Sequence, residues 1–172
     1  CFYARTRHFF CLNQLPSICL IISCLIISIR EGAFGDVLRA RNKWDGIEYA
    51  IKRSKNQFRG PSQKDQMLKE VHALAALANG TGEMQTPHIV RYYNTWCEDE
   101  RLYIQMELCE KSLENVLYGT KNAPKMALED ILLLTRHMLL ALDAVHKLKI
   151  VHLDIKPGNI FIKGGQYKLG DL

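Results

Sequence analysis

The stretch that decides the fold is VHLDIKPGNI, residues 151–160. It brings a histidine, an aspartate, a lysine and an asparagine together between two apolar segments. Before it, apolar residues recur at helical spacing over residues 128–148, which predicts a buried helix. The residues expected on the buried stripe of that helix are Leu132, Leu139, Leu142 and Val145. Short β-branched runs predict strands at 150–151, 160–162 and 167–170. The polar stretch is therefore predicted to be a loop held between a helix and small strands.

Upstream of this loop, short apolar runs alternate with turns. Asp45-Gly46 is a strong turn signal between two such runs and predicts a hairpin. A helix is predicted over residues 63–78, where Met67, Val71, Leu74 and Leu77 fall on one stripe. The strands expected in this half are 37–40, 48–54, 89–96 and 102–108. Strands first and helices later predict an α+β fold with two lobes.

Composition is ordinary for one globular domain: 172 residues, 48% hydrophobic, 24% charged, with a formal net charge of +5. Lysines and arginines are scattered, so we do not expect nucleic-acid binding. The six cysteines show no C-x-x-C spacing and no zinc-finger pattern with histidine. We therefore expect neither a structural metal site nor disulfides, and a reducing compartment.

The first thirty residues differ from the rest of the chain. Residues 9–29 carry no charge, and ~20 such residues can span a bilayer as a helix. A signal peptide is a second interpretation, although no small-residue cleavage site follows. Residues 25–29 (LIISI), however, suit a strand leading into the glycine-rich segment, and they cannot also end a membrane helix. We expect residues 1–24 to be an extension apart from the domain, either foreign to it or unplaced, and residues 25–172 to be the domain.

Gly32 to Val37 (GAFGDV) has the form of the second half of a G-x-G-x-x-G-x-V loop. Glycines let backbone amides approach and cradle phosphates, so Gly32, Phe34, Gly35 and Val37 are candidate nucleotide-binding residues. A tight strand–turn–strand gives the same pattern, so this match is weak by itself. Arg30 occupies the position of the first glycine. Either it belongs with the foreign N-terminal sequence, or the loop binds nucleotide less tightly.

Lys52 lies within an apolar strand of sequence YAIK, residues 49–52. Burying an ammonium requires a partner, and Glu70 in the predicted helix can supply one. The alternative is an ordinary strand lysine and a glutamate on the helix surface. The position of Lys52, one hairpin after the glycine-rich loop, favours the functional interpretation.

The polar loop resembles the catalytic loop of protein kinases, H-R-D-L-x-x-x-N, at His152, Asp154 and Asn159. The resemblance implies that Asp154 accepts the proton of the attacking hydroxyl and that Lys156 meets the γ-phosphate. Asn159 would hold magnesium together with Asp171, which stands where kinases have D-F-G. By the same resemblance, the Lys52–Glu70 pair would hold the α- and β-phosphates.

Among kinases, the chain resembles the Wee family, which restrains mitosis by phosphorylating the cyclin-dependent kinase. The matching text is YAIKRSKN, LKEVHALAAL, HIVRYYNTWCEDERLYIQMELC, VHLDIKPGNIFI and KLGDL, from about Gly32 to Leu172. Leu172 replaces the usual phenylalanine, and Leu153 replaces the catalytic-loop arginine. That arginine normally pairs with an activation-loop phosphate. Its absence implies an enzyme that needs no such phosphate.

A second resemblance is to the translation-initiation-factor-2 alpha kinases, which have similar sequences at VRYYNTW and IQMELCEKS. Those kinases carry a long insert between the two segments, whereas here only residues 97–101 separate Trp96 from Leu102. They also keep H-R-D. Lys156 is a serine/threonine-type feature that the Wee family shares while acting mainly on tyrosine, so the acceptor residue stays open.

A non-catalytic binding module, or pseudokinase, is the alternative from another class. Such proteins usually lack Lys52, Asp154 or Asp171, and all three are present. Only Arg30 favours this alternative.

The kinase resemblance also implies an adenine site and an internal spine. Met106 would lie behind the adenine, Glu107 and Cys109 would offer it backbone hydrogen bonds, and three side chains would sandwich the ring: Val37, Ala50 and Phe161. The spine would be Leu74, Tyr92, His152 and Leu172, and plain core packing is the alternative for all four.

Together these resemblances imply a two-lobed protein-kinase-like α+β fold with a complete small lobe and the first part of a helical large lobe. The small lobe would span about 25–106, the hinge 107–111 and the large lobe from 112 onward. The implied cofactors are ATP and Mg²⁺, and the implied partner is a protein substrate such as a cyclin-dependent kinase. We expect an intracellular monomer, nuclear or cytoplasmic. The activation segment and peptide-docking helices are missing, so we expect these 172 residues to be inactive and poorly stable alone.

Overall fold

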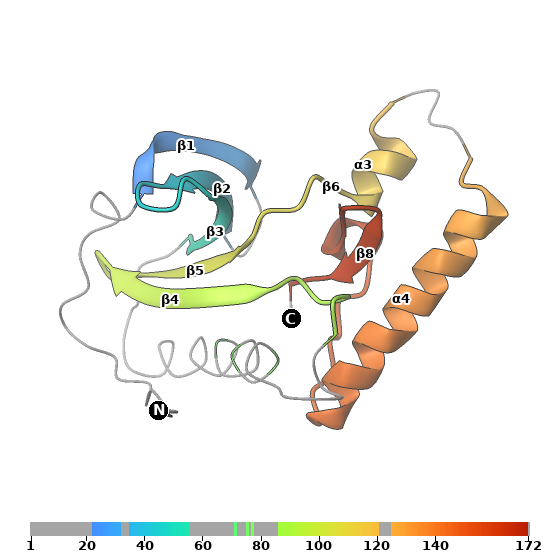
Figure 1. The fold of residues 1–172 in the computed structure, drawn as a ribbon. Coiled ribbons are helices and arrows are strands. Elements are labelled where there is room, and N and C mark those ends of the chain that lie inside the picture. The colour runs from blue at the N-terminus through green and yellow to red at the C-terminus, as the bar shows by residue number, and fades with distance from the viewer. Residues whose placement is uncertain are drawn as a thin grey trace, which may run out of the picture.

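The computed structural model describes residues 22–31, 35–55, 71, 75, 77, 86–120 and 125–171 (Figure 1). The fold is α+β, as predicted. The elements of its first half are β1 (Ile22–Glu31), β2 (Gly35–Asn42), β3 (Glu48–Ser54), β4 (Tyr92–Glu98) and β5 (Arg101–Glu107). Those of its second half are β6 (Lys111–Ser112), α3 (Leu113–Tyr118), α4 (Leu128–Lys147), the 3₁₀ turn η2 (Pro157–Asn159), β7 (Ile160–Lys163) and β8 (Gln166–Leu169).

The first half forms a five-stranded antiparallel sheet in the order β1-β2-β3-β5-β4. Successive strand residues face opposite sides, so Tyr103 packs with Ala40 and Ile51 on one face. Leu102 and Ile104 pack on the other face with the helical residues Val71 and Ala75 and with Tyr92. This sheet supplies Lys52 from its central strand.

The predicted hairpin is confirmed. The turn between β2 and β3 is closed by Gly46 N–H donating to the Asn42 carbonyl at 3.1 Å. Gly46 has φ 69°, a left-handed conformation that favours glycine. Asp45 Oδ1 accepts from Ile47 N–H at 2.7 Å, which explains why Asp-Gly suits this position.

The second half packs a small sheet, in the order β6-β7-β8, against α4 (Figure 1). The buried face of α4 includes Ala141 and Val145, both 0% exposed, and it meets the fully buried Leu169 of β8. The segment joining α4 to β7 is the polar loop predicted from the sequence. Its two ends are therefore held by a buried helix and a small sheet.

The predicted stripe of α4 is wrong in part. Leu132 and Leu139 are 61% and 63% exposed, whereas Val145 is buried as predicted. The helix carries apolar residues on two faces. The face that packs into the core contains the buried residues His137, Ala141, Ala144 and Val145, and the predicted residue Leu142 is partly buried against the same core. We call the face that carries Leu132 and Leu139 the leucine face. Among the described residues, none buries it as fully as Val145 is buried on the other face.

Other boundaries also differ from the predictions. The segment 150–151 is not a strand, because Ile150 N–H bonds to the Val145 carbonyl at 3.3 Å at the end of the helix. Residue Ile89 forms only an isolated bridge to Leu169, and β4 begins at Tyr92. The short elements β6 and α3 were not predicted. A capping box between Ser112 and Asn115 starts α3.

Near the N-terminus, the predicted strand at 25–29 is confirmed, but β1 begins at Ile22. Residues 22–24 are thus part of the sheet, while residues 1–21 lie outside the described residues. The predicted helix over 63–78 is described only at Val71, Ala75 and Leu77, which are helical and buried. Within the described residues, no helix has both the length and the apolar composition needed to cross a membrane.

Candidate active site

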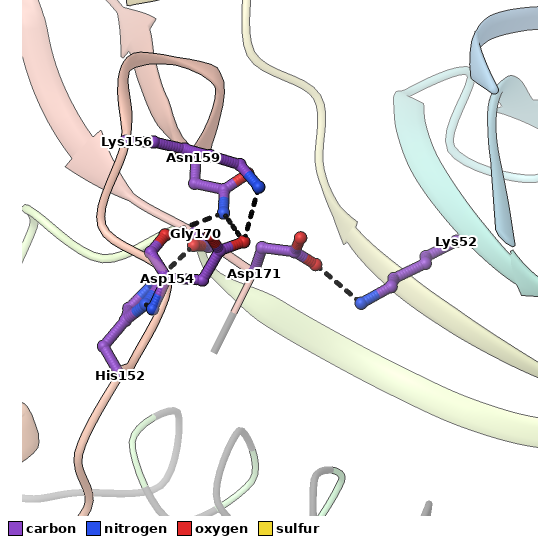
Figure 2. Close-up of polar contacts among 7 residues, drawn as sticks. All are labelled: Lys52, His152, Asp154, Lys156, Asn159, Gly170 and Asp171. Atoms are coloured by element: carbon purple, nitrogen blue, oxygen red, sulfur yellow. Dashed lines mark hydrogen bonds and ion pairs between the residues drawn. The ribbon is translucent and has the colours of Figure 1, made fainter. Parts of the chain in front are cut away.

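The polar loop, the end of β8 and the middle of β3 meet at one place (Figure 2). Asp154, Lys156 and Asn159 come from the loop and η2, Asp171 follows β8, and Lys52 reaches across from β3. Residues that lie far apart in the sequence are therefore brought to one site, as the motif order predicts.

Asp154 is held as an ionised acceptor. Its Oδ2 accepts from Lys156 Nζ at 2.6 Å and from Asn159 Nδ2 at 2.9 Å. The hydrogen bond from Lys156, followed by that from Asn159, holds the pKa of Asp154 below its ordinary value. The Asp154 side chain is 47% exposed, so it is open to an incoming hydroxyl group. A carboxylate that is charged and accessible can accept a proton.

His152 supports Asp154 from behind. It is 7% exposed, and its Nδ1 lies 3.3 Å from Asp154 N–H. A backbone N–H can only donate, so Nδ1 accepts and Nε2 carries the proton that it donates to the Gly170 carbonyl at 2.9 Å. These contacts of His152 join the polar loop to the segment just before Asp171 (Figure 2). Leu153, between His152 and Asp154, has φ 60° and is 91% exposed.

Asn159 has the features of a metal ligand. It is 0% exposed, and its Nδ2 donates to both the backbone and side-chain oxygens of Asp154. Its Oδ1 is buried without a hydrogen-bond partner. An orphaned buried oxygen is costly unless something else satisfies it. Magnesium prefers oxygen ligands and is usually held by one or two carboxylates plus substrate phosphates, so Asn159 and Asp171 fit it.

Asp171 is placed by the backbone before it. Gly170 N–H donates to the Asn159 carbonyl at 2.9 Å. A Cβ on Gly170 would lie 2.8 Å from Phe161 Cε2 and 2.9 Å from Val90 Cγ2, so a side chain fits poorly there. Asp171 itself has φ 64°, and its Oδ1 lies 2.6 Å from Lys52 Nζ. The hydrogen bond between Gly170 and Asn159 therefore links the two candidate magnesium ligands, Asn159 and Asp171.

The predicted partner of Lys52, Glu70, lies outside the described residues. Lys52 pairs with Asp171, with side chains 20% and 30% exposed. A lysine in an apolar strand does find a carboxylate, as the sequence argument required. Its pairing with Glu70 stays a prediction.

The predicted adenine-contacting side chains share one face of the sheet. Val37 pairs with Lys52, and Ala50 pairs with Met106. Directly paired residues, and residues two apart on one strand, point to the same side. Val37, Ala50, Lys52 and Met106 therefore line the same surface, which is the arrangement a nucleotide site needs.

The glycine-rich loop is described only in part, since Gly32 and Phe34 lie outside the described residues. Gly35 has φ 151°, and a Cβ there would lie 2.1 Å from the Arg53 carbonyl oxygen. Only glycine fits this position. Arg30, at the place of the first glycine, pairs with Val37 between β1 and β2.

The connection after β5 holds the remaining predicted nucleotide contacts. Glu107 N–H donates to the Arg91 carbonyl at 2.8 Å, so a backbone contact from Glu107 to adenine would have to use its carbonyl oxygen. Cys109 is a free thiol, and burial, followed by the charge of Glu107, raises its pKa to about 11. Phe161 lies on β7 against the Gly170 position. Of the predicted spine, Tyr92 and His152 are buried, and Leu74 and Leu172 lie outside the described residues.

Sequence reasoning missed a charged cluster behind this connection. The carboxylate of Glu107 is buried against Lys168 of β8 at 2.8 Å. Lys168 lies between the buried residues Tyr167 and Leu169. A lysine within an apolar strand was the signal used for Lys52, and it would have singled out Lys168 as well.

Comparison with known proteins agrees with this geometry. The protein kinase domain family model matches residues 26–172. A Wee1-like protein kinase of Arabidopsis thaliana is 41% identical over 146 residues, covering 85% of this chain and 28% of that protein. The Wee1-like protein kinase 2 of Gallus gallus is 41% identical over 139 residues, covering 78% of this chain and 23% of that protein.

A probable protein kinase of Dictyostelium discoideum is 40% identical over 134 residues, covering 78% of this chain and 13% of that protein. The chain thus spans between 13% and 28% of the length of these three relatives. The match covers the sheet, the polar loop and the segment up to Asp171. The chain belongs to the protein kinase domain family, and it resembles the Wee1-like kinases within that family.

Proposed function

We propose that this chain is the nucleotide-handling part of an enzyme that transfers the γ-phosphoryl group of ATP to a protein hydroxyl. The observation that carries the proposal is the meeting of Asp154, Asn159, Asp171 and Lys52 at one site (Figure 2). Asp154, Asp171 and Lys52 supply charge at this site, and Asn159 supplies a buried oxygen without a hydrogen-bond partner. Phosphoryl transfer depends mainly on positioning and charge stabilisation, which fixed side chains can supply.

In this mechanism, Asp154 accepts the proton of the attacking hydroxyl, since its carboxylate is ionised and about half exposed. Lys156 Nζ, which lies 2.6 Å from Asp154 Oδ2, also donates to the γ-phosphate when ATP is bound. Lys52 turns from Asp171 toward the α- and β-phosphates. Asn159 Oδ1 and the Asp171 carboxylate would hold magnesium, which would supply positive charge to stabilise the phosphate groups.

The finer proposal is a Wee-like role: phosphorylation of a tyrosine in the glycine-rich loop of a cyclin-dependent kinase, restraining mitotic entry. Support comes from relatives named Wee1-like protein kinase at 36% to 41% identity. The short connection between β4 and β5 also supports it, because Glu98 pairs directly with Arg101 and no insert intervenes. We propose an intracellular site of action and a monomer on the same resemblance.

Transfer to a protein also needs a surface that docks the substrate. The activity test therefore uses an extended protein, defined as these 172 residues followed by a segment that completes the kinase domain. It is incubated with γ-labelled ATP and with two candidate substrates, a cyclin-dependent kinase and the alpha subunit of translation initiation factor 2. Label on tyrosine of the former supports the Wee-like proposal. Label on serine of the latter alone favours the initiation-factor kinases.

A pseudokinase is the second candidate function, and Arg30 in place of the first loop glycine is the observation that favours it. It would bind nucleotide without transferring phosphate. In the same assay, label on either substrate rules out a pseudokinase.

A further inference from the structure

The carboxylate of Glu107 lies at the junction of three segments. Glu107 is the last residue of β5 and is 7% exposed. Its Oε1 accepts from Arg91 N–H at 2.7 Å and from Lys168 Nζ at 2.8 Å. Its Oε2 lies 3.3 Å from Lys163 Nζ. We call these four residues the Glu107 cluster. The cluster joins β5, the segment before β4, and the β7–β8 hairpin.

The charges of this cluster depend on one another. Burial by itself would raise the pKa of Glu107, but hydrogen bonds from Lys168 and Arg91 and the charges of Lys168 and Lys163 together lower it. Glu107 is therefore a buried carboxylate, matched by a lysine that is 11% exposed. A buried ion that loses its partner is strongly destabilised, so each charge holds the other in place. The cluster fixes position, which exposed ion pairs do poorly.

From the Glu107 cluster, the backbone leads directly to the magnesium ligand. Lys168 is followed by Leu169, whose N–H donates to the His88 carbonyl and whose carbonyl accepts from Val90 N–H, both at 2.8 Å. Arg91, bound to Glu107, continues the same segment. Glu107 therefore contacts both segments of the bridge between Ile89 and Leu169, through Arg91 on one side and Lys168 on the other. Asp171 follows Leu169 by two residues.

A closed chain of contacts results. Asp171 pairs with Lys52, and Lys52 lies opposite Ile104 on β5. β5 ends at Glu107, which returns through Lys168 to Asp171. The β3–β5 part of the sheet is thus connected to Asp171 in two ways: by the Lys52–Asp171 ion pair and by the Glu107–Lys168 ion pair. A shift of β8 relative to β5 would change both the ion pair at Lys52 and the place of Asp171.

We propose that the Glu107 side chain is a positioning residue that acts through Lys168 to hold Asp171 where it binds magnesium on the nucleotide. The inference rests on the proposed function, because it assumes that Asp171 is a magnesium ligand. It assigns to the Glu107 side chain a role separate from any backbone contact with adenine. It also assigns a role to Lys168, which the kinase motifs do not include.

The test measures how much magnesium tightens nucleotide binding to the extended protein defined above. Dissociation constants are determined for adenosine, for ATP with a chelator, and for ATP with magnesium. The ratio of the last two is the magnesium gain. Replacing partners that orient metal ligands commonly costs 10–100-fold in metal affinity, so Glu107→Gln should lower the gain about tenfold while adenosine affinity changes less than about twofold.

Matched variants separate positioning from general damage. Glu110→Gln alters an exposed carboxylate of the same connection, which accepts from Gly164 N–H at 2.9 Å on the same hairpin, and should keep the full gain. The double variant Glu107→Gln, Lys168→Gln leaves no unpaired glutamate–lysine charge at their contact, so it should fold where a single variant does not. It should show the same reduced gain. Circular dichroism melts confirm that each variant is folded.

Three results overturn the inference in different ways. A parent chain with no magnesium gain contradicts the proposed function itself. A parent with a gain that folded Glu107→Gln and double variants retain contradicts only the role of Glu107. Parallel loss of adenosine and magnesium–ATP binding would show that Glu107 supports the fold generally and does not position Asp171.

Discussion

Replacing Asp154 by asparagine tests the proposed proton transfer with the smallest change in shape. Asparagine keeps one oxygen for the Asn159 amide, but it cannot accept the proton of an attacking hydroxyl. A positioned general base contributes about 10²–10⁴-fold, so kcat of the extended protein should fall by about that factor. The KM for ATP should change little, because the asparagine oxygen can still accept from Lys156 and Asn159, the two candidate phosphate and magnesium contacts that Asp154 touches.

The structure also indicates that this loss is not due to unfolding. Asp154 and Lys156 are 47% and 48% exposed, and breaking an exposed pair costs little stability. The melting temperature of Asp154→Asn should therefore remain near that of the parent. Buried contacts of the loop, such as the bond from His152 Nε2 to the Gly170 carbonyl, are unaffected by the substitution.

Asp143→Asn is a matched control. Asp143 is also an exposed aspartate paired with a lysine, Lys147 at 2.9 Å, but it lies on α4 away from the loop. Initial rates for parent, Asp154→Asn and Asp143→Asn are compared at saturating magnesium–ATP and substrate. If Asp154→Asn retained the parent rate, or if Asp143→Asn lost as much, Asp154 would not be the base.

Three further outcomes are expected. Lys52→Met should abolish most activity of the extended protein and raise the KM for ATP, because it removes the charge that meets the phosphates; an unchanged KM would contradict that role. Phosphatase treatment of the active extended protein should leave its rate nearly unchanged, since Leu153 offers no partner to an activation-loop phosphate, and Leu153→Arg alone should not create phosphate dependence. A large loss that mapped to a phosphate in the activation segment would contradict this. Acid should destabilise the fold below about pH 6.5, the ordinary histidine pKa. Burial lowers the pKa of both His88 and His137, whose rings stack at 3.9 Å, so the unfolded chain takes up protons that the folded chain excludes. The free energy of unfolding, measured against pH, should flatten in His137→Gln and not in a variant of the exposed His146.

Much of the site could be predicted because motif spacing reports which residues share a loop. Asp154 and Asn159 are close in the sequence, and the turn η2 (Pro157–Asn159) between them keeps the two side chains together. Lys52 was predicted to need a carboxylate, and it has one in Asp171. The rule that a lysine in an apolar strand needs a charged partner holds whichever carboxylate supplies it.

Other features depend on contacts that spacing does not encode. Both apolar faces of α4 have helical periodicity, and contacts with β8 and with Leu77, Leu113 and Ile160 decide that Ala141 and Val145 are the buried ones. The pair of Glu107 and Lys168 joins residues from separate elements, so no local pattern links them. The short element α3 begins at a capping box that Ser112 and Asn115 form, which is a weaker signal than a long apolar period.

The most direct test of the central claim is transfer of label from γ-labelled ATP to protein by the extended protein. The account predicts magnesium-dependent label on a protein hydroxyl, which a chelator removes and which Asp154→Asn reduces by about 10²–10⁴. Nucleotide that binds with magnesium while no label reaches any protein would contradict it, and would assign the site of Asp154, Asn159 and Asp171 to binding without catalysis.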